Sequence, residues 1–166
     1  MKLVCVLLLI LVPHRPQIEP GQTCLFECLH FLRPSRSVDQ YIQDFHKFTG
    51  SSQDVYSDGA RATVAQTIAF IKSEADTVDG QFSIVGALQA NYRIITDMPT
   101  DGELDHSIVL VGLKMSGSDA LNPFKIDLRY YDPGYNKVRS MNMYQWLRTN
   151  PKYWIIVKAA ISFASA

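Results

Sequence analysis

The sequence predicts an α+β fold in which an N-terminal helical lobe precedes an antiparallel β-sheet lobe. In the first half, apolar side chains recur at helical spacing, whereas the second half contains β-branched runs and alternation of apolar and polar residues. No internal repeat, low-complexity tract or long linker interrupts the 166 residues, and this length suits one domain with its own core. We therefore expect residues 1–166 to form a single domain.

The segment 24–32 (CLFECLHFL) is the first expected helix. It places Leu25, Leu29 and further apolar side chains at helical spacing. Thr23 is the expected N-cap, because its hydroxyl can accept hydrogen bonds from the amides of the first turn. The Arg33-Pro34 pair then ends the helix, since the residue before a proline disfavours helical backbone angles.

Two further helices and a mixed segment complete the first half. Residues 37–48 carry an apolar stripe and Gly50 lies just past their end, while residues 61–75 carry the stripe of a third helix. Residues 81–92 are ambiguous but suit a helix, and residues 92–96 (YRIIT) then suit a short strand.

Strands are expected to dominate the second half. Residues 106–113 (HSIVLVGL) are apolar and β-branched, and residues 124–131 (FKIDLRYY) alternate apolar with polar side chains. The turn residues Asp132-Pro133-Gly134 close that strand. A short helix over residues 141–148 and a last strand over residues 153–161 follow.

Composition excludes several classes of protein. Hydrophobic residues are 47% and charged residues 19%, a balance that excludes disorder as the main state. Sixteen Lys plus Arg balance sixteen Asp plus Glu, so no basic field exists to hold a nucleic acid. Three cysteines, Cys5, Cys24 and Cys28, are too few for a disulfide framework, and at least one must remain a thiol.

The apolar run over residues 1–12 (MKLVCVLLLILV) has two readings. It resembles the charged and apolar regions of a signal peptide, although no small-x-small cleavage motif follows it. It also suits a core strand or short helix that ends at Pro13. It is too short for a transmembrane helix, which needs roughly 20 apolar residues.

Cys24 is the candidate nucleophile because it begins a helix. The amides and the dipole of a helix N-terminus favour the thiolate, which is the nucleophilic form. Cys28 lies one turn further on the expected buried side, and Cys5 lies within the apolar run. These two are expected to be buried structural residues.

A cysteine nucleophile needs a base and a third group that orients the base. His106 is the candidate base because it opens an apolar strand after a polar stretch, at a rim where catalytic side chains tend to lie. The other three histidines lie in a proline-rich loop (His14) or in expected helices (His30 and His46). Asp132 ends the strand expected to pair with the His106 strand in a hairpin, which would place its carboxylate beside the imidazole.

Acyl transfer also needs hydrogen-bond donors for the developing oxyanion. The Cys24 amide is one candidate, and a glutamine side chain is the second. Gln17 is favoured over Gln22, because Gln22 shares the turn of Cys24 whereas Gln17 is far enough upstream to fold back across the site. The grouping of Cys24, Cys28 and His30 lacks a second pair at zinc-ligand spacing, so no metal or cofactor is expected.

These motifs together resemble the papain-like cysteine peptidases of bacteria, in particular plant-pathogen effector proteases and bacteriocin-leader peptidases. The resemblance covers residues 12–158 and includes a Val-Pro, a Gln, a Cys that starts a helix, a His-strand-Gly element and an Asp-Pro turn. In this sequence these are Val12-Pro13, Gln17, Thr23-Cys24, His106 to Gly112 and Tyr131-Asp132-Pro133-Gly134. The chain departs from the pattern at Leu25, where those families usually have Trp or Gly.

The resemblance implies a papain-like fold with Cys24 as nucleophile, His106 as base, Asp132 as orienting residue and Gln17 as oxyanion donor. It also favours a core element over a signal peptide for residues 3–12. The 26 residues from His106 to Asp132 exceed the usual spacing, which predicts an extended hairpin loop over residues 114–123.

The leading functional hypothesis is a cysteine peptidase that acts on proteins or peptides, as a secreted effector or toxin delivered into a target cell; a cytoplasmic location is the alternative. The same triad would also serve a glutamine deamidase, an amidase or a transglutaminase-like acyltransferase, and the loops that set specificity leave this choice open. A third hypothesis is a papain-like binding module without catalysis. Nucleic acid and a stable membrane span are not expected, and the oligomeric state is open.

Overall fold

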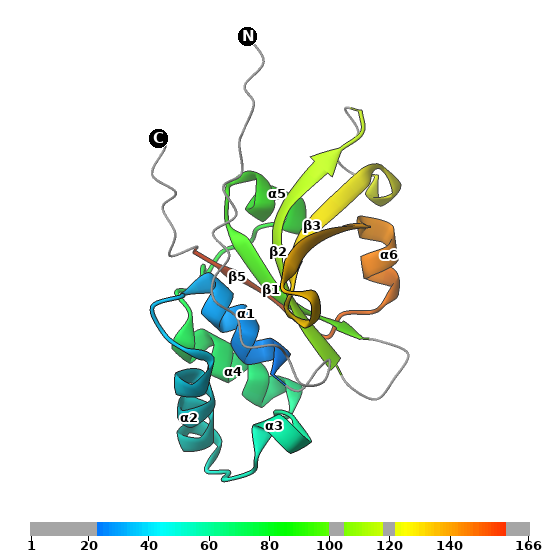
Figure 1. Cartoon of the computed structure of the whole chain (residues 1–166). Coiled ribbons are helices and arrows are strands. Elements are labelled where there is room, and N and C mark those ends of the chain that lie inside the picture. The colour runs from blue at the N-terminus through cyan, green and yellow to red at the C-terminus, as the bar shows by residue number, and fades with distance from the viewer. Residues whose placement is uncertain (1–22, 100–104, 118–121, 159–166) are drawn as a thin grey trace.

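The computed structural model describes residues 23–99, 105–117 and 122–158, which form helices and a five-stranded antiparallel sheet (Figure 1). The helices are α1 (Cys24–Leu32), α2 (Val38–Thr49), α3 (Val55–Asp58), α4 (Val64–Glu74), α5 (Ile84–Gln89) and α6 (Met143–Arg148). The strands are β1 (Arg93–Pro99), β2 (Asp105–Met115), β3 (Ile126–Asp132), β4 (Lys137–Asn142) and β5 (Trp154–Val157). Two short 3₁₀ turns, η1 (Pro123–Lys125) and η2 (Pro133–Tyr135), flank β3.

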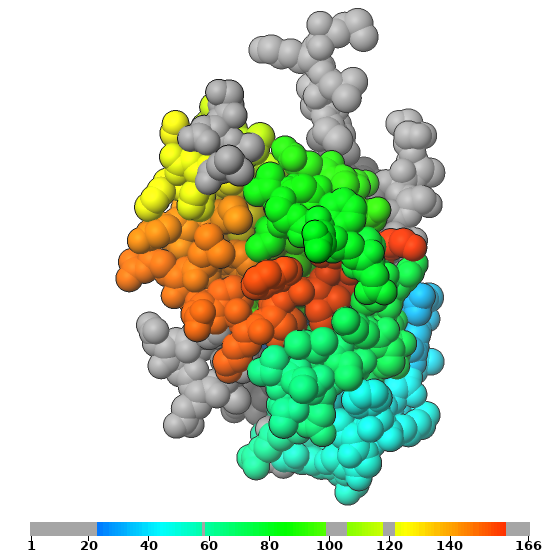
Figure 2. Space-filling view, turned by 180° about the vertical axis from the view of Figure 1, so that it is seen from behind, coloured from blue at the N-terminus to red at the C-terminus, as the bar shows by residue number. Residues whose placement is uncertain are grey.

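The strand order in the sheet is β4-β3-β2-β1-β5, and every neighbouring pair is antiparallel. The expected hairpin between the His106 strand and the Asp132 strand is therefore confirmed, with Val109 opposite Tyr131. The chain returns after α6 to add β5 at the opposite edge, beside β1. In Figure 2 the orange-red residues of this last segment lie at the surface. Trp154, in β5, is half exposed.

Helices cover both faces of the sheet. Successive strand residues point to opposite faces, so neighbouring residues pack into different cores. Ile95, Val109 and Tyr131 pack into one core with α1, α2 and α4. Their chain neighbours Ile94 and Leu110 pack into a second core with α5 and α6, which also contains the fully buried Trp146. Figure 1 shows α2, α3 and α4 grouped below α1, with α6 beside β4.

Local sequence signals explain several helix boundaries. In α2 the Ser37 side chain accepts from the Gln40 amide and the Gln40 side chain accepts from the Ser37 amide, a reciprocal capping box. Gly50 ends this helix in the left-handed conformation, with φ of 69°. Thr63 starts α4 with the same kind of capping box. The expectation for α1 is only half right, since Thr23 is the N-cap residue but its side chain makes no capping hydrogen bond.

Three expectations about local structure are wrong. Phe124 does not belong to β3, because Asn122 and Pro123 start a 3₁₀ turn that leaves its ring exposed. The loop expected over residues 114–123 is shorter, since Lys114 and Met115 continue β2 opposite Asp127 and Ile126. Finally, the helix expected over residues 141–148 begins only at Met143, because Met141 and Asn142 end β4 opposite Leu128 and Asp127. Neither α3 nor β4 is among the expected elements.

Several expectations fall on segments outside the described residues. They concern the apolar run over residues 1–12, with Cys5, and the loop residues His14, Gln17 and Gln22. The last expected strand is present as Trp154–Val157, and residues 159–161 also lie outside the description. Among the helices described, none has the length and apolar character needed to cross a membrane.

Candidate active site

Cys24 is the first residue of α1, as the sequence predicts. Its side chain is buried, with 3% of the residue exposed, and the helical hydrogen-bond ladder begins beyond it with Glu27 N donating to Thr23 O at 3.0 Å. Cys24 therefore lies at the positive end of the α1 dipole. The Ser107 amide of β2 donates to Cys24 Sγ at 3.2 Å, so this end of α1 is fixed against the strand that carries His106.

His106 and Asp132 meet across the β2–β3 hairpin. The paired part of the hairpin ends with Val109 opposite Tyr131, so Asp132, the next residue of β3, lies close to the start of β2, where His106 stands. His106 Nε2 and Asp132 Oδ1 lie 2.9 Å apart, and both side chains are nearly buried. The other ring nitrogen, Nδ1, is also buried and makes no regular hydrogen bond within the described part of the chain.

The Asp132 carboxylate is held on both oxygens. Oδ1 also accepts from the Gly134 amide at 3.1 Å, as expected of an Asp-Pro-Gly turn, and Oδ2 accepts from Arg139 at 2.9 Å. Burial alone would raise the pKa of Asp132, but hydrogen bonds and charge from His106 and Arg139 lower it below its usual value. Asp132 is therefore an anion at neutral pH and can orient the imidazole.

The His106 ring is a stronger base than an ordinary histidine. Burial lowers its pKa, but interactions with Asp132 and with the Cys24 side chain outweigh burial and raise the pKa to about 9. Since Nε2 faces Asp132, Nδ1 is the nitrogen left to serve the thiol. A raised pKa favours the protonated ring, which can donate its proton during a reaction.

Glu27, Ser107 and Arg139 are site residues that the sequence analysis did not identify. Glu27 lies one turn beyond Cys24, is 3% exposed, and has a pKa that burial raises to about 7. Arg139 stands on β4, which the sequence analysis did not predict. The acidic residue at i+3 from Cys24 is a visible sequence signal, whereas the contact of the Ser107 amide depends on how α1 docks.

The structure thus brings together Cys24, His106 and Asp132, whereas the two other histidines in the described part of the chain, His30 and His46, have different surroundings. His30 Nδ1 contacts the Arg36 carbonyl at 2.6 Å, and His46 lies near the end of α2, both half-buried. Within the described ranges, no group of three or more His, Cys, Asp or Glu side chains is arranged to hold a metal ion.

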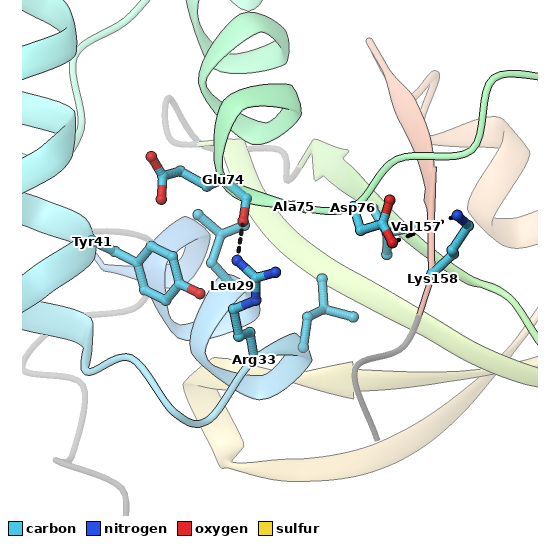
Figure 3. A pocket seen from close by; sticks show the side chains of 9 residues that line it. Leu29, Arg33, Tyr41, Glu74, Ala75, Asp76, Val157 and Lys158 are labelled. Carbon is cyan, nitrogen blue, oxygen red and sulfur yellow. Dashed lines mark hydrogen bonds and ion pairs between the residues drawn. The ribbon is translucent and has the colours of Figure 1, made fainter. Parts of the chain in front are cut away.

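A pocket of about 240 Å³ lies at the other end of α1, away from Cys24 (Figure 3). It is lined by Leu29, Leu32 and Arg33, by Tyr41 of α2, and by the segments that end α4 and β5. Leu32 is eight residues from Cys24, or about 12 Å along the helix. The pocket therefore does not belong to the Cys24 site.

Comparison of the chain with models of known protein families, with curated proteins and with solved structures finds no match.

Proposed function

We propose that the protein is a papain-like cysteine peptidase in which Cys24 is the nucleophile, His106 the acid–base residue and Asp132 the residue that orients His106. The observation that carries the proposal is the spatial arrangement of the Cys24, His106 and Asp132 side chains. A buried cysteine starts a helix, an imidazole interacts with it, and a carboxylate 2.9 Å from the far ring nitrogen fixes that ring. This arrangement serves nucleophilic attack on a carbonyl group.

The chemistry follows from the protonation states of the site. The Cys24 thiolate attacks the carbonyl carbon of a peptide bond. The Cys24 amide is the proposed donor to the resulting oxyanion, and the family resemblance implies Gln17 as the second donor. His106 Nδ1 gives its proton to the leaving amine as the C–N bond breaks, which leaves a thioester. His106 then takes a proton from water, and the hydroxide attacks the thioester. The C–S bond breaks, the carboxylic acid leaves, and the Cys24 thiolate and the His106 imidazolium are restored.

The proposed substrate class is a protein or peptide. The chain has a formal net charge of zero, so the protein as a whole does not select a strongly charged polymer. Next to Asp132, the exposed Tyr135 ring lies under the Arg139 guanidinium, 4.4 Å from ring centroid to guanidinium carbon. An aromatic and cationic group so near the site suits a polypeptide better than an apolar small molecule.

The decisive experiment measures which thiol reacts. Iodoacetamide labelling between pH 5 and pH 9, read by peptide mass mapping, is expected to modify Cys24 ahead of Cys28 and Cys5. His106→Ala should slow labelling of Cys24 at pH 6 at least about tenfold, because the imidazolium no longer stabilises the thiolate. His30→Ala is the matched control and should leave the rate unchanged. Equal labelling of all three cysteines would refute the assignment of Cys24.

A second assay identifies the reaction. The wild type and Cys24→Ala are incubated with an unfolded protein mixture, and products are analysed by intact mass and by labelling of new amino termini. Peptidase activity predicts new termini that depend on Cys24. Mass gains of roughly 1 Da per glutamine without new termini would instead indicate a deamidase, since the same acyl chemistry then acts on a side-chain amide. No product of either kind would contradict the enzyme proposal.

A further inference from the structure

The backbone N–H and C=O groups of Ser107 lie where β3 stops pairing with β2. The last pairs of this ladder place Tyr130 opposite Leu110 and Tyr131 opposite Val109, so the same register would bring Pro133 opposite Ser107. Proline has no amide hydrogen, and here it begins the turn η2. Ser107 therefore needs other partners for its buried N–H and C=O groups.

Two thiols of α1 provide those partners. The Ser107 amide donates to Cys24 Sγ at 3.2 Å, and Cys28 Sγ donates to the Ser107 carbonyl at 3.3 Å. The two cysteines are four residues apart, so both face β2 from the same side of the helix. Cys28 is fully buried, and burial raises its pKa well above the usual value, which keeps it a thiol that can donate. Its contact shows that it is more than a space-filling residue.

A tyrosine contacts the Ser107 side chain. The Tyr153 and Ser107 hydroxyls lie 3.2 Å apart. Tyr153 is itself fixed by β1, since Thr96 donates to its carbonyl at 2.6 Å and Asp97 Oδ1 accepts from its amide at 3.2 Å. Ser107 is thus restrained at its carbonyl and at its side chain, while its amide points at the Cys24 sulfur.

We propose that Cys28 and Tyr153 are positioning residues that hold the Ser107 amide in line with the Cys24 sulfur, where this amide stabilises the thiolate. The proposal rests on the proposed function, in which Cys24 is the nucleophile. A preorganised donor in a buried site is more effective than a mobile one, because it does not have to reorient when the charge appears.

Other charged and titratable groups also face the Cys24 sulfur or its neighbours. They come from every element packed around it: Cys28 and Glu27 on α1, His106 on β2, Asp132 at the end of β3 with Arg139 on β4, Asp97 on β1, and Tyr153 before β5. Among these, His106 has the largest expected influence, because it carries a positive charge next to the sulfur. The amide adds a second, uncharged contribution, which the test must separate from that of His106.

The test is the pH midpoint of Cys24 alkylation by iodoacetamide, followed on the Cys24 peptide by mass spectrometry. Cys28→Ala removes the donor to the Ser107 carbonyl, whereas Cys28→Ser keeps a donor at the same position. Tyr153→Phe and Ser107→Ala each remove the hydroxyl contact from one side. We expect Cys28→Ala and Tyr153→Phe to move the midpoint upward by about half to one pH unit, because the thiolate loses a well-aligned donor.

Three comparisons decide the outcome. Cys28→Ser should stay closer to the wild-type midpoint than Cys28→Ala, and the double variant Ser107→Ala/Tyr153→Phe should shift no more than either single one, since both remove the same contact. An unchanged midpoint in folded Cys28→Ala and Tyr153→Phe, judged by circular dichroism, would overturn the proposal while leaving Cys24 as nucleophile. If wild-type Cys24 shows no preferential reaction, the proposed function itself fails.

Discussion

His106 Nε2 lies 2.9 Å from Asp132 Oδ1, and this contact joins two residues that are 26 positions apart in the chain. It depends on the antiparallel pairing of β2 and β3, which brings the end of β3 to the start of β2. A carboxylate in this position both orients the imidazole and stabilises its protonated form. The pair therefore determines how the site responds to pH and to substitution.

Asp132→Asn should lower the pKa of His106. The variant keeps the shape of the side chain but removes the negative charge that helps to raise the pKa to about 9. NMR titration of the His106 ring protons would measure the change, with a fall toward the ordinary value near 6.5 expected. An unchanged pKa would contradict the role of Asp132 as the group that stabilises the imidazolium.

Arg139→Gln should act in the opposite direction on the same resonance. Removing this cation leaves the charge of Asp132 less neutralised, so the pKa of His106 should rise above that of the wild type. Because the Arg139 side chain is 40% exposed, the free energy of unfolding should fall by less than about 1 kcal/mol. Lys137→Gln, which removes a neighbouring exposed cation of β4, is the control and should have the smaller effect.

The His106–Asp132 pair should make the stability of the protein depend on pH. The folded protein binds the His106 proton more tightly than the unfolded chain, since the pKa rises from 6.5 to about 9 on folding. This contribution is complete below pH 6.5 and is lost as the pH rises through 9, with a size on the order of 3 kcal/mol. Urea unfolding of the wild type and His106→Gln between pH 6 and pH 10 should show their difference shrinking over that range.

Glu27→Gln should stabilise the protein at alkaline pH. Burial raises the pKa of Glu27 from 4.5 to about 7. The folded wild type therefore loses stability relative to the unfolded chain as the pH rises from 4.5 through 7. The variant should match the wild type near pH 4.5 and exceed it above pH 7, by an amount on the order of 3 kcal/mol. The exposed Asp79→Asn serves as control in the same urea measurements. A gain that does not vary with pH would argue against this explanation.

Phe26→Ala should lower the free energy of unfolding more than a substitution on the exposed side of the same core. Phe26 is fully buried and packs edge-to-face on Phe45 and Phe70, so its loss should cost about 3–5 kcal/mol. Phe48 also contacts Phe70 but is 45% exposed, and Phe48→Ala should cost less than about 1 kcal/mol. Chemical denaturation of both variants measures the difference, and equal losses would contradict the described packing of α1.

Much of the fold is visible in local sequence. The capping residue Ser37, the glycine at position 50 and the Asp-Pro-Gly turn act through their immediate neighbours, so these boundaries could be predicted. The start of α4 is expected at residue 61, but the capping box of Thr63 places it at Val64. The strand β4 could not, because Lys137–Asn142 is a polar edge strand without apolar alternation, and its identity comes from pairing with β3. Phe124 continues the apolar–polar alternation of β3 in the sequence. In the structure it lies instead in the 3₁₀ turn that Asn122 and Pro123 start.

The sequence by itself determined three candidate site residues, because a cysteine at a helix start, a histidine at a strand start and an aspartate at a strand end each have a local signature. It could not reveal that two thiols of α1 hold the Ser107 peptide group, since those contacts join residues 79 and 83 positions apart. Only the tertiary structure decided this. Where Pro133 ends the pairing of β3 with β2, the buried N–H and C=O groups of Ser107 must find partners, and the docked helix supplies them.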